Sequence, residues 1–398
     1  MRRILLVVVL LVVSASVASA ALLPLPTRLA NALAVPGNPA AASSAVAVDL
    51  QSGRVIFARH PDLPLAPASN EKLVVSFAAL RELGPGYRFR TELLGRGHQE
   101  DGVWYGDVFL KGFGDPTLTS VQVERLAAQV RQLGITRIAG RIYADESWFD
   151  ARRMAPGWKS SYFIGECPPL SALVVDRAWY DHHTARQPAL AAAGRLKALL
   201  GSHGVASGVV GLGRAPADAY ALAQVESDPL SAVLAAMDRE SDNFSAEMLL
   251  KTLGAEVGAS GTTANGAGIV VRDLAAAAIP LAGVRVADGS GLSLEDRLTA
   301  RALAALLVVL WNDVDLRDPF RASLPVAGVS GTLEKRLRTA PARGVVRAKT
   351  GTTDEASALS GYVRDRYGFA VVQNGRPVHT WSARKAQDRF AAALASAD

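Results

Sequence analysis

Residues 67–80 read PASNEKLVVSFAAL, and this stretch decides most of what the sequence predicts about the fold. The apolar residues after Lys72 recur at helical spacing, and Gly84-Pro85 marks the end of the helix. Because Lys72 follows Ser69 by three residues, the two side chains share one helix face about one turn apart. The stretch therefore predicts a helix that carries a hydroxyl and an amine side by side at its start.

Two further motifs follow this one along the chain. They are Ser241-Asp242-Asn243, in a break between two helical patterns, and Lys349-Thr350-Gly351, at the end of a strand-like run. By chance, an S-x-x-K pattern is expected about 0.6 times, but a K-T-G pattern only about 0.04 times. A second S-x-x-K, from Ser382 to Lys385, comes after the K-T-G, and we expect it on the surface.

The chemistry of the three motifs is coherent. A serine hydroxyl is a weak nucleophile until a neighbouring base takes its proton. Lys72 can be that base only when neutral, and both burial and a second cation lower the pKa of a lysine. Lys349 is the candidate second cation. The alternative, in which Ser69 merely caps a helix and Lys72 is solvated, is disfavoured once all three motifs occur in order.

Strand-like runs lie at both ends of the chain, with helical patterns between them. Residues 44–50 and 54–59 resemble a hairpin joined by Gln51-Ser52-Gly53. Near the C-terminus, strands are expected at 344–348, 358–363 and 367–373, followed by a helix at 386–395. The pattern predicts one sheet assembled from segments that are distant in sequence.

The pattern of expected strands and helices changes between residues 87 and 225. Strands are expected at 89–94, 103–110 and 137–143, and helices at 121–132 and 189–200. We interpret residues 87–225 as an inserted α+β domain, which splits the main domain into residues 21–86 and 226–398.

Composition excludes several classes of protein. Apolar residues make up 49% of the 398 residues, which fits a globular chain with one or two hydrophobic cores. The single cysteine, Cys167, allows no intrachain disulfide, and no His-Glu-x-x-His motif suggests a metal. The net charge of +6 is spread along the chain, so nucleic-acid binding is not indicated. No cofactor or metal is expected.

The first twenty residues have the pattern of an export signal. Arg2 and Arg3 precede the apolar run from Ile4 to Val13, and Ala18-Ser19-Ala20 resembles a cleavage site. We expect cleavage after Ala20 and a mature protein outside the cytoplasmic membrane, without a stable membrane span. The alternative is an uncleaved membrane anchor.

The three motifs resemble the active-site signature of serine penicillin-binding proteins and serine β-lactamases. Two further strings, at residues 113–118 (FGDPTL) and 288–293 (DGSGLS), make the resemblance more specific. Together they are similar to the D-alanyl-D-alanine carboxypeptidase/endopeptidase family, the class C low-molecular-mass penicillin-binding proteins. The resemblance runs from about residue 44 to the C-terminus.

The resemblance implies a mixed α+β fold. It consists of a transpeptidase/β-lactamase-like domain, with an antiparallel sheet flanked by helices and a helical subdomain, and a smaller inserted α+β domain. It also implies a secreted hydrolase that acts on peptidoglycan stem peptides and binds β-lactam antibiotics as covalent inhibitors.

The resemblance assigns roles to the motif residues. Ser69 matches the acylated nucleophile, Lys72 its general base, and Ser241 the hydroxyl that relays a proton to the leaving D-alanine. The remaining matches concern substrate binding, at Asn243, Lys349, Thr350 and Thr352. Thr352, with the main-chain N–H of Ser69, matches the oxyanion position.

Several points stay open on the sequence alone. Thr353-Asp354-Glu355 departs from the family pattern and can alter which stem peptide fits. Relatives use the region of Asp145 and Phe149 near the stem-peptide side chain, whereas Asp115 is interpreted as a turn residue. The alternative functions are a β-lactamase or esterase of the same fold, and a non-catalytic protein that binds the cell wall. The oligomeric state is not indicated.

Overall fold

The computed structural model describes residues 23–37 and 41–397, so the predicted export signal lies outside the described residues. Its main sheet has five antiparallel strands in the order β11-β12-β13-β1-β2, which confirms a sheet built from both ends of the chain. The strands are β1 (Ser43–Asp49), β2 (Val55–Arg59), β11 (Val346–Thr352), β12 (Ala356–Val363) and β13 (Tyr367–Asn374).

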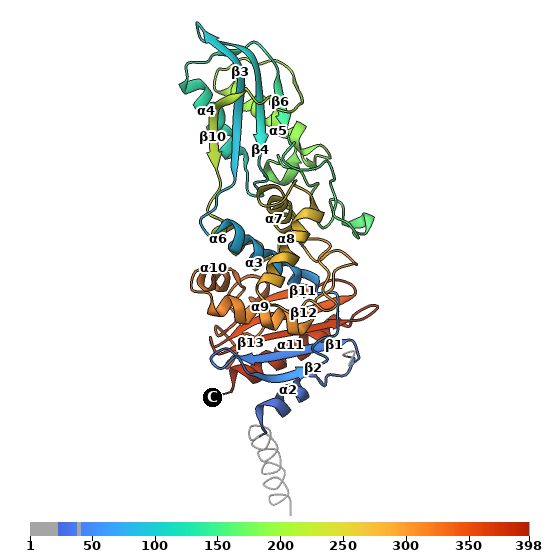
Figure 1. Cartoon of the computed structure of the whole chain (residues 1–398). Helices are drawn as coiled ribbons and strands as arrows, with labels where there is room; N and C mark the ends of the chain where they lie inside the picture. The colour runs from blue at the N-terminus through green and yellow to red at the C-terminus, as the bar shows by residue number, and fades with distance from the viewer. Residues whose placement is uncertain (1–22, 38–40, 398) are drawn as a thin grey trace, which may run out of the picture.

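Successive side chains of a strand point to opposite faces of the sheet, and in this sheet both sets are apolar and need cover. In β1, Ala45 and Ala47 belong to one core, while Val46 and Val48 belong to another. Helices α2 (Leu25–Leu33) and α11 (Thr380–Ala395) cover the first face, and α9 (Ala300–Asn312) covers the second. The sheet is therefore the middle layer of a three-layer unit (Figure 1).

A group of helices packs beyond α9 and carries the first two motifs. The helix expected from Ser69 begins as a single turn, η1 (Ala68–Asn70), and continues as α3 (Glu71–Leu83), which ends at Gly84 as predicted. The other members of the group are α6 (Leu230–Glu240), α7 (Asn243–Glu256), α8 (Thr263–Ala276) and α10 (Arg317–Ser323).

A second sheet is formed entirely by residues between α3 and α6. Its strands run in the order β10-β3-β4-β6-β9, with β5 beside β4, and helices α4 and α5 pack on it around a separate core. The bounds are β3 (Arg90–Glu100), β4 (Val103–Gly112), α4 (Ser120–Gln132), β5 (Arg137–Ile138), β6 (Ile142–Asp145), α5 (Pro188–Ser202), β9 (Val210–Leu212) and β10 (Tyr220–Glu226). Figure 1 shows the two sheets at opposite ends of an elongated molecule, with α3, α6, α7 and α8 between them.

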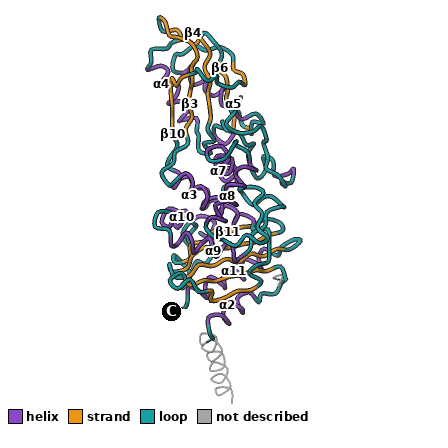
Figure 2. Tube along the Cα trace, in the orientation of Figure 1, coloured by secondary structure: helices purple, strands orange, loops and turns teal. Residues whose placement is uncertain are grey.

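The long connection between β6 and α5 consists mostly of loop, as Figure 2 shows. Its only regular elements are two short turns, η2 (Ser160–Tyr162) and η3 (Asp176–Ala178), and a pair of short antiparallel strands, β7 (Trp179–Tyr180) and β8 (His183–Thr184). The separate sheet and core agree with an inserted unit, while its boundaries at residues 87 and 225 stay a prediction. Among the described residues, no helix combines the length and apolar character that crossing a membrane requires.

Three local expectations need correction. The strand expected at 137–143 is divided into β5 and β6, because between them the N–H of Arg141 donates to the side chain of Asp107 at 2.8 Å. Glycine is required at position 140, where a Cβ would lie 2.1 Å from the carbonyl oxygen of Gly106. Helix α11 begins at Thr380, six residues before the expected start. Ser382, expected on the surface, is only 7% exposed, since its hydroxyl donates to the carbonyl oxygen of Pro36 at 2.8 Å.

Candidate active site

Ser69 lies in the turn η1, directly before α3. Its Oγ is 3.0 Å from Lys72 Nζ, and Asn70 rather than Ser69 is the N-cap residue of α3. The alternative in which Ser69 only caps a helix is therefore wrong. Ala68 has a φ of 47°, a conformation that costs free energy in a residue with a Cβ. This tight turn orients the hydroxyl of Ser69 toward Lys72.

Lys72 is completely buried and is held by three oxygen atoms. Besides Ser69 Oγ, its Nζ contacts Asn243 Oδ1 at 2.8 Å and the carbonyl oxygen of Ser290 at 2.7 Å. Burial lowers the pKa of Lys72, although nearby carboxylates, Asp288 first, oppose this. A neutral amine has two N–H bonds and one lone pair. The two carbonyl oxygens can take the N–H bonds, which leaves the lone pair for the serine hydroxyl.

The second motif forms the turn between α6 and α7. Ser241 ends α6 in the left-handed conformation, with a φ of 60°, and Asp242 caps α7 by accepting from the N–H of Ser245 at 2.9 Å. This break between helices, as predicted, directs Ser241 and Asn243 toward the other motifs. Lys349 Nζ donates to Ser241 Oγ at 2.7 Å.

Lys349 lies within β11 rather than at its end, since the strand continues to Thr352. Burial, together with the charge of Lys72, lowers the pKa of Lys349 to about 7. The side chain of Asn70 donates to the main-chain carbonyl of Lys349 at 3.0 Å and so ties the serine turn to the strand. A Cβ at Gly351 would lie 3.1 Å from the nitrogen of Ser69, so glycine allows this close approach.

Thr350 and Thr352 occupy different environments on β11. The hydroxyl of Thr350, which is nearly buried, donates to Thr332 Oγ1 at 2.8 Å. Thr352 is exposed at the rim, where its hydroxyl donates to the carbonyl of Gly351 and accepts from Arg384 at 3.2 Å. The structure thus brings all seven predicted site residues together around Ser69 and Lys72, and Thr352 lies at the edge of this group.

The connection between β6 and α5 contributes two contacts that the sequence did not reveal. The guanidinium of Arg177 donates to both carboxylate oxygens of Asp242, at 2.6 and 2.8 Å. The amide of Asn243 donates to the carbonyl oxygen of Glu166 at 3.1 Å, which fixes its Oδ1 toward Lys72. No motif signals these contacts, because one is a main-chain carbonyl and the other an isolated arginine.

The turn at residues 288–292 lies beside Lys72 and supplies the Ser290 carbonyl that contacts its Nζ. Asp288 accepts from the main-chain N–H of Gly291 at 2.7 Å and from the indole of Trp158 at 2.7 Å. Glu247 accepts from the main-chain N–H of Ser290 at 2.8 Å. Burial raises the pKa of Glu247 to about 8. These contacts place the Ser290 carbonyl that holds Lys72.

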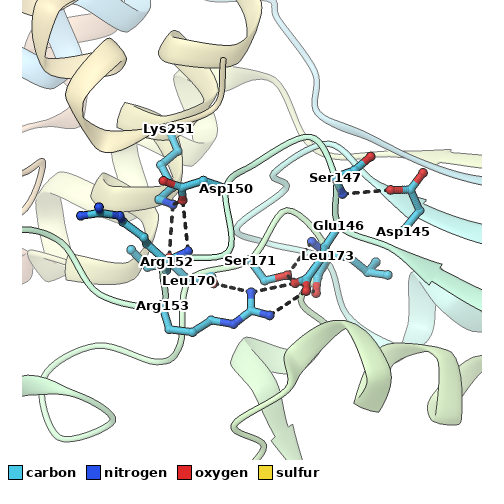
Figure 3. Close-up of polar contacts among 10 residues, drawn as sticks. All are labelled: Asp145, Glu146, Ser147, Asp150, Arg152, Arg153, Leu170, Ser171, Leu173 and Lys251. Atoms are coloured by element: carbon cyan, nitrogen blue, oxygen red, sulfur yellow. Dashed lines mark hydrogen bonds and ion pairs between the residues drawn. The ribbon is translucent and has the colours of Figure 1, made fainter. Parts of the chain in front are cut away.

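Asp145 lies apart from the motif residues. Its carboxylate accepts from the main-chain N–H groups of Ser147 at 2.9 Å and Ala215 at 2.9 Å, which is a structural arrangement. Figure 3 shows the neighbouring contacts, in which Lys251 of α7 pairs with Asp150. The ion pair of Lys251 with Asp150 therefore joins the loop after β6 to α7.

Two hollows flank Ser69. A cleft of about 460 Å³ is lined by Ser69, Ser241, Thr350 and neighbouring cations. A second cavity, of about 630 Å³, is lined by residues that include Ala68 and Asp354. Ser69 therefore lines the first hollow, and its neighbour Ala68 lines the second.

The comparisons with known proteins agree with this geometry. Residues 25–189 and 181–397 match the D-Ala-D-Ala carboxypeptidase 3 (S13) family. The chain is 31% identical to a D-alanyl-D-alanine carboxypeptidase of an Actinomadura species, over 90% of this chain and 82% of the relative. It is 34% identical to a carboxypeptidase of Mycobacterium tuberculosis, over 82% of this chain and 75% of the relative.

A solved structure supports the fold. Penicillin binding protein 4 of Haemophilus influenzae superposes with a TM-score of 0.81 at 22% identity, over 92% of this chain and 98% of that chain. The chain therefore belongs to the D-Ala-D-Ala carboxypeptidase 3 (S13) family of serine hydrolases, the class C low-molecular-mass penicillin-binding proteins.

Proposed function

We propose that this enzyme is a secreted D,D-peptidase that hydrolyses the D-Ala-D-Ala bond of peptidoglycan stem peptides through an acyl-enzyme on Ser69. The observation that carries the proposal is the position of the buried Lys72 Nζ, 3.0 Å from Ser69 Oγ and held by two further oxygen atoms. An amine so placed is suited to take the serine proton.

The residues of the site account for each step of acylation. Ser69 Oγ attacks the carbonyl carbon of the penultimate D-alanine while its proton passes to Lys72 Nζ. The carbonyl oxygen becomes an oxyanion, which the main-chain N–H groups of Ser69 and Thr352 stabilise. The C–N bond then breaks, and the departing nitrogen receives a proton through Ser241 Oγ, which Lys349 contacts at 2.7 Å.

Deacylation restores the enzyme. Water attacks the ester carbon, Lys72 accepts the proton of the water, and Ser69 leaves with a proton. Lys349 and Thr350 hold the terminal carboxylate of the substrate before cleavage. By the same chemistry, a β-lactam carbonyl acylates Ser69. The solved structure of a relative in complex with a β-lactam supports this expectation.

The proposed function is tested by D-alanine release from a stem pentapeptide ending in D-Ala-D-Ala. We expect release by the wild type and none by Ser69→Ala. Ser382→Ala is the matched control, because it removes the serine of the second S-x-x-K pattern, and it should retain activity. Equal activity of Ser69→Ala and the wild type would refute the proposal. Rapid turnover of a chromogenic cephalosporin without pentapeptide hydrolysis would favour the β-lactamase alternative.

A further inference from the structure

Asp238 is a buried carboxylate among the helices behind the site, and the mechanism above does not use it. It is 0% exposed and lies in the last turn of α6, three residues before Ser241. Its Oδ2 accepts from Ser76 Oγ of α3 at 3.0 Å and from Ser323 Oγ of α10 at 2.8 Å. Asp238 is thus fixed at a place where three helices meet.

The carboxyl group of Asp238 is only partly satisfied by its neighbours. Its Oδ1 is buried and has no hydrogen-bond partner among the residues that the structure describes. An ionised carboxylate is unfavourable in the interior unless a positive charge compensates it. Asp238 therefore needs a cation close by if it is to be ionised at neutral pH.

Lys349 is the cation that compensates Asp238. Its Nζ donates to Ser241 Oγ at 2.7 Å, which brings the ammonium to the last turn of α6. Burial raises the pKa of Asp238 to about 6, and the charge of Lys349 opposes this rise. Burial first, and the charge of Lys72 second, lower the pKa of Lys349 to about 7, and the charge of Asp238 opposes this fall. Each group thus favours the charged form of the other.

The other charged groups near α6 have partners elsewhere. Lys72 of α3 also acts on Asp238, but less strongly than Lys349 does. Glu71 of α3 is buried as well, and the charges that act on it belong to Asp288, Glu247 and Lys72. The remaining pairs on the helices packed against α6 are Glu82 with Arg272, Arg317 with Asp318, Arg321 with Asp365, Lys251 with Asp150, and Glu247 with the main chain at 289 and 290. The carboxylate that acts on Lys349 is thus Asp238.

We propose that Asp238 is a positioning residue of the site, whose buried negative charge keeps Lys349 protonated. This inference rests on the proposed function, in which Lys349 holds the terminal carboxylate of the substrate. Asp238 is fully buried and does not line the cleft beside Ser69, so it acts through Lys349 and not by contact with the substrate.

The experiment is the pH profile of kcat/KM for D-alanine release from the pentapeptide. Asp238→Asn removes the negative charge and keeps the shape of the side chain. The alkaline fall in kcat/KM should then move to lower pH by about one unit, as expected when a lysine loses a nearby opposite charge. At pH 7 this shift corresponds to about a fivefold loss. An amide-capped peptide, which has no terminal carboxylate for Lys349 to hold, should show no such shift.

Three further variants serve as controls. Asp273→Asn is the matched control, because Asp273 is also a buried aspartate, 2% exposed, but lies on α8 and pairs with Arg272 at 2.9 Å. It should leave the midpoint of the profile unchanged. Ser76→Ala and Ser323→Ala each remove one donor to Asp238 and so disfavour its ionised form. Both should move the midpoint in the same direction by a smaller amount, and they test the proposal even if Asp238→Asn does not fold.

The outcomes separate an electrostatic role from a structural one. If Asp238 only holds the helices together, its replacement lowers kcat/KM equally at every pH and leaves the midpoint in place, which would overturn the proposal. An unchanged midpoint in both serine variants would overturn it as well.

Labelling of Ser69 by a penicillin, measured over the same pH range, distinguishes this proposal from the proposed function. If the wild type is labelled but releases no D-alanine, the proposed function fails, and a shifted labelling midpoint in Asp238→Asn supports the role of Asp238. If D-alanine is released and no midpoint shifts, the role of Asp238 is refuted and the proposed function stands. A wild type that does neither refutes both.

Discussion

Removal of Arg177 should slow acylation of Ser69, although Arg177 touches no predicted site residue. Its guanidinium makes a two-point pair with Asp242, the central residue of the turn that carries Ser241 and Asn243. Burial pushes the pKa of Asp242 upward, but the hydrogen bonds from Arg177 and Ser245 outweigh it and keep the pKa below its ordinary value. The carboxylate is therefore ionised and paired.

The magnitude follows from the exposure of the pair. A charge-assisted hydrogen bond contributes about 1.5–3 kcal/mol when well shielded. The Arg177 side chain is 52% exposed and that of Asp242 is 14% exposed, so solvent screening reduces the pair to about 1–1.4 kcal/mol. If this free energy holds the turn in its active form, Arg177→Ala lowers the acylation rate constant about five- to tenfold.

The assay is the second-order rate constant for labelling by a fluorescent penicillin. It is measured for Arg177→Ala, Asp242→Asn and the double variant, with Arg186→Ala as the control at an exposed arginine of the same segment. A coupling free energy of about 1 kcal/mol between positions 177 and 242 is expected. Unchanged labelling by Arg177→Ala, or additive effects of the two substitutions, would refute the reasoning.

Three further predictions follow from the packing and charges around the site. Gly291→Ala should abolish acylation, because its Cβ would lie 1.9 Å from the carbonyl oxygen of Ala68 and glycine alone suits its φ of 82°; labelling at the wild-type rate would contradict this. Burial first, and a neighbouring ammonium second, lower the pKa of Lys349 to about 7, so kcat/KM for a peptide with a free terminal carboxylate should fall above pH 7. An equal fall for the amide-capped peptide would exclude Lys349 as the cause. Burial raises the pKa of Glu247 to about 8. Its contribution to the free energy of unfolding is therefore fully present below pH 4.5 and is lost as the pH rises through 8. Glu247→Gln, which keeps an acceptor for the 289–290 main chain, should therefore raise Tm relative to the wild type at pH 9 but not at pH 4, and calorimetry at the two pH values decides.

Much of the fold could be predicted because local patterns agree with the tertiary structure. The strand-like run at 44–50 differs from β1 by one residue at each end, and α3 ends before Gly84 as predicted, although it begins at Glu71 rather than at Ser69. The spacing of Ser69 and Lys72 was sufficient to place them together, since three residues in a helical turn fix that geometry. Strands at both ends of the chain predicted one sheet built from distant segments, and the pairing of β1 with β13 confirms it.

Other features could not be predicted, because they depend on tertiary contacts. Ser382 looks like a surface serine, but the carbonyl of Pro36, 346 residues away, accepts its hydrogen bond. The carbonyl of Glu166 that orients Asn243 has no side-chain signature. Nothing in the sequence distinguishes Arg384 from the other arginines. It lines the cleft only because the fold places α11 beside β11.

The most direct test of the central claim is mass spectrometry of the intact protein after incubation with a penicillin, followed by peptide mapping. The account predicts one covalent adduct per chain on the peptide that contains Ser69, and no adduct in Lys72→Ala at the same exposure. An adduct on Ser241 or elsewhere, or full labelling without Lys72, would contradict the assignment of Ser69 as nucleophile and Lys72 as its base.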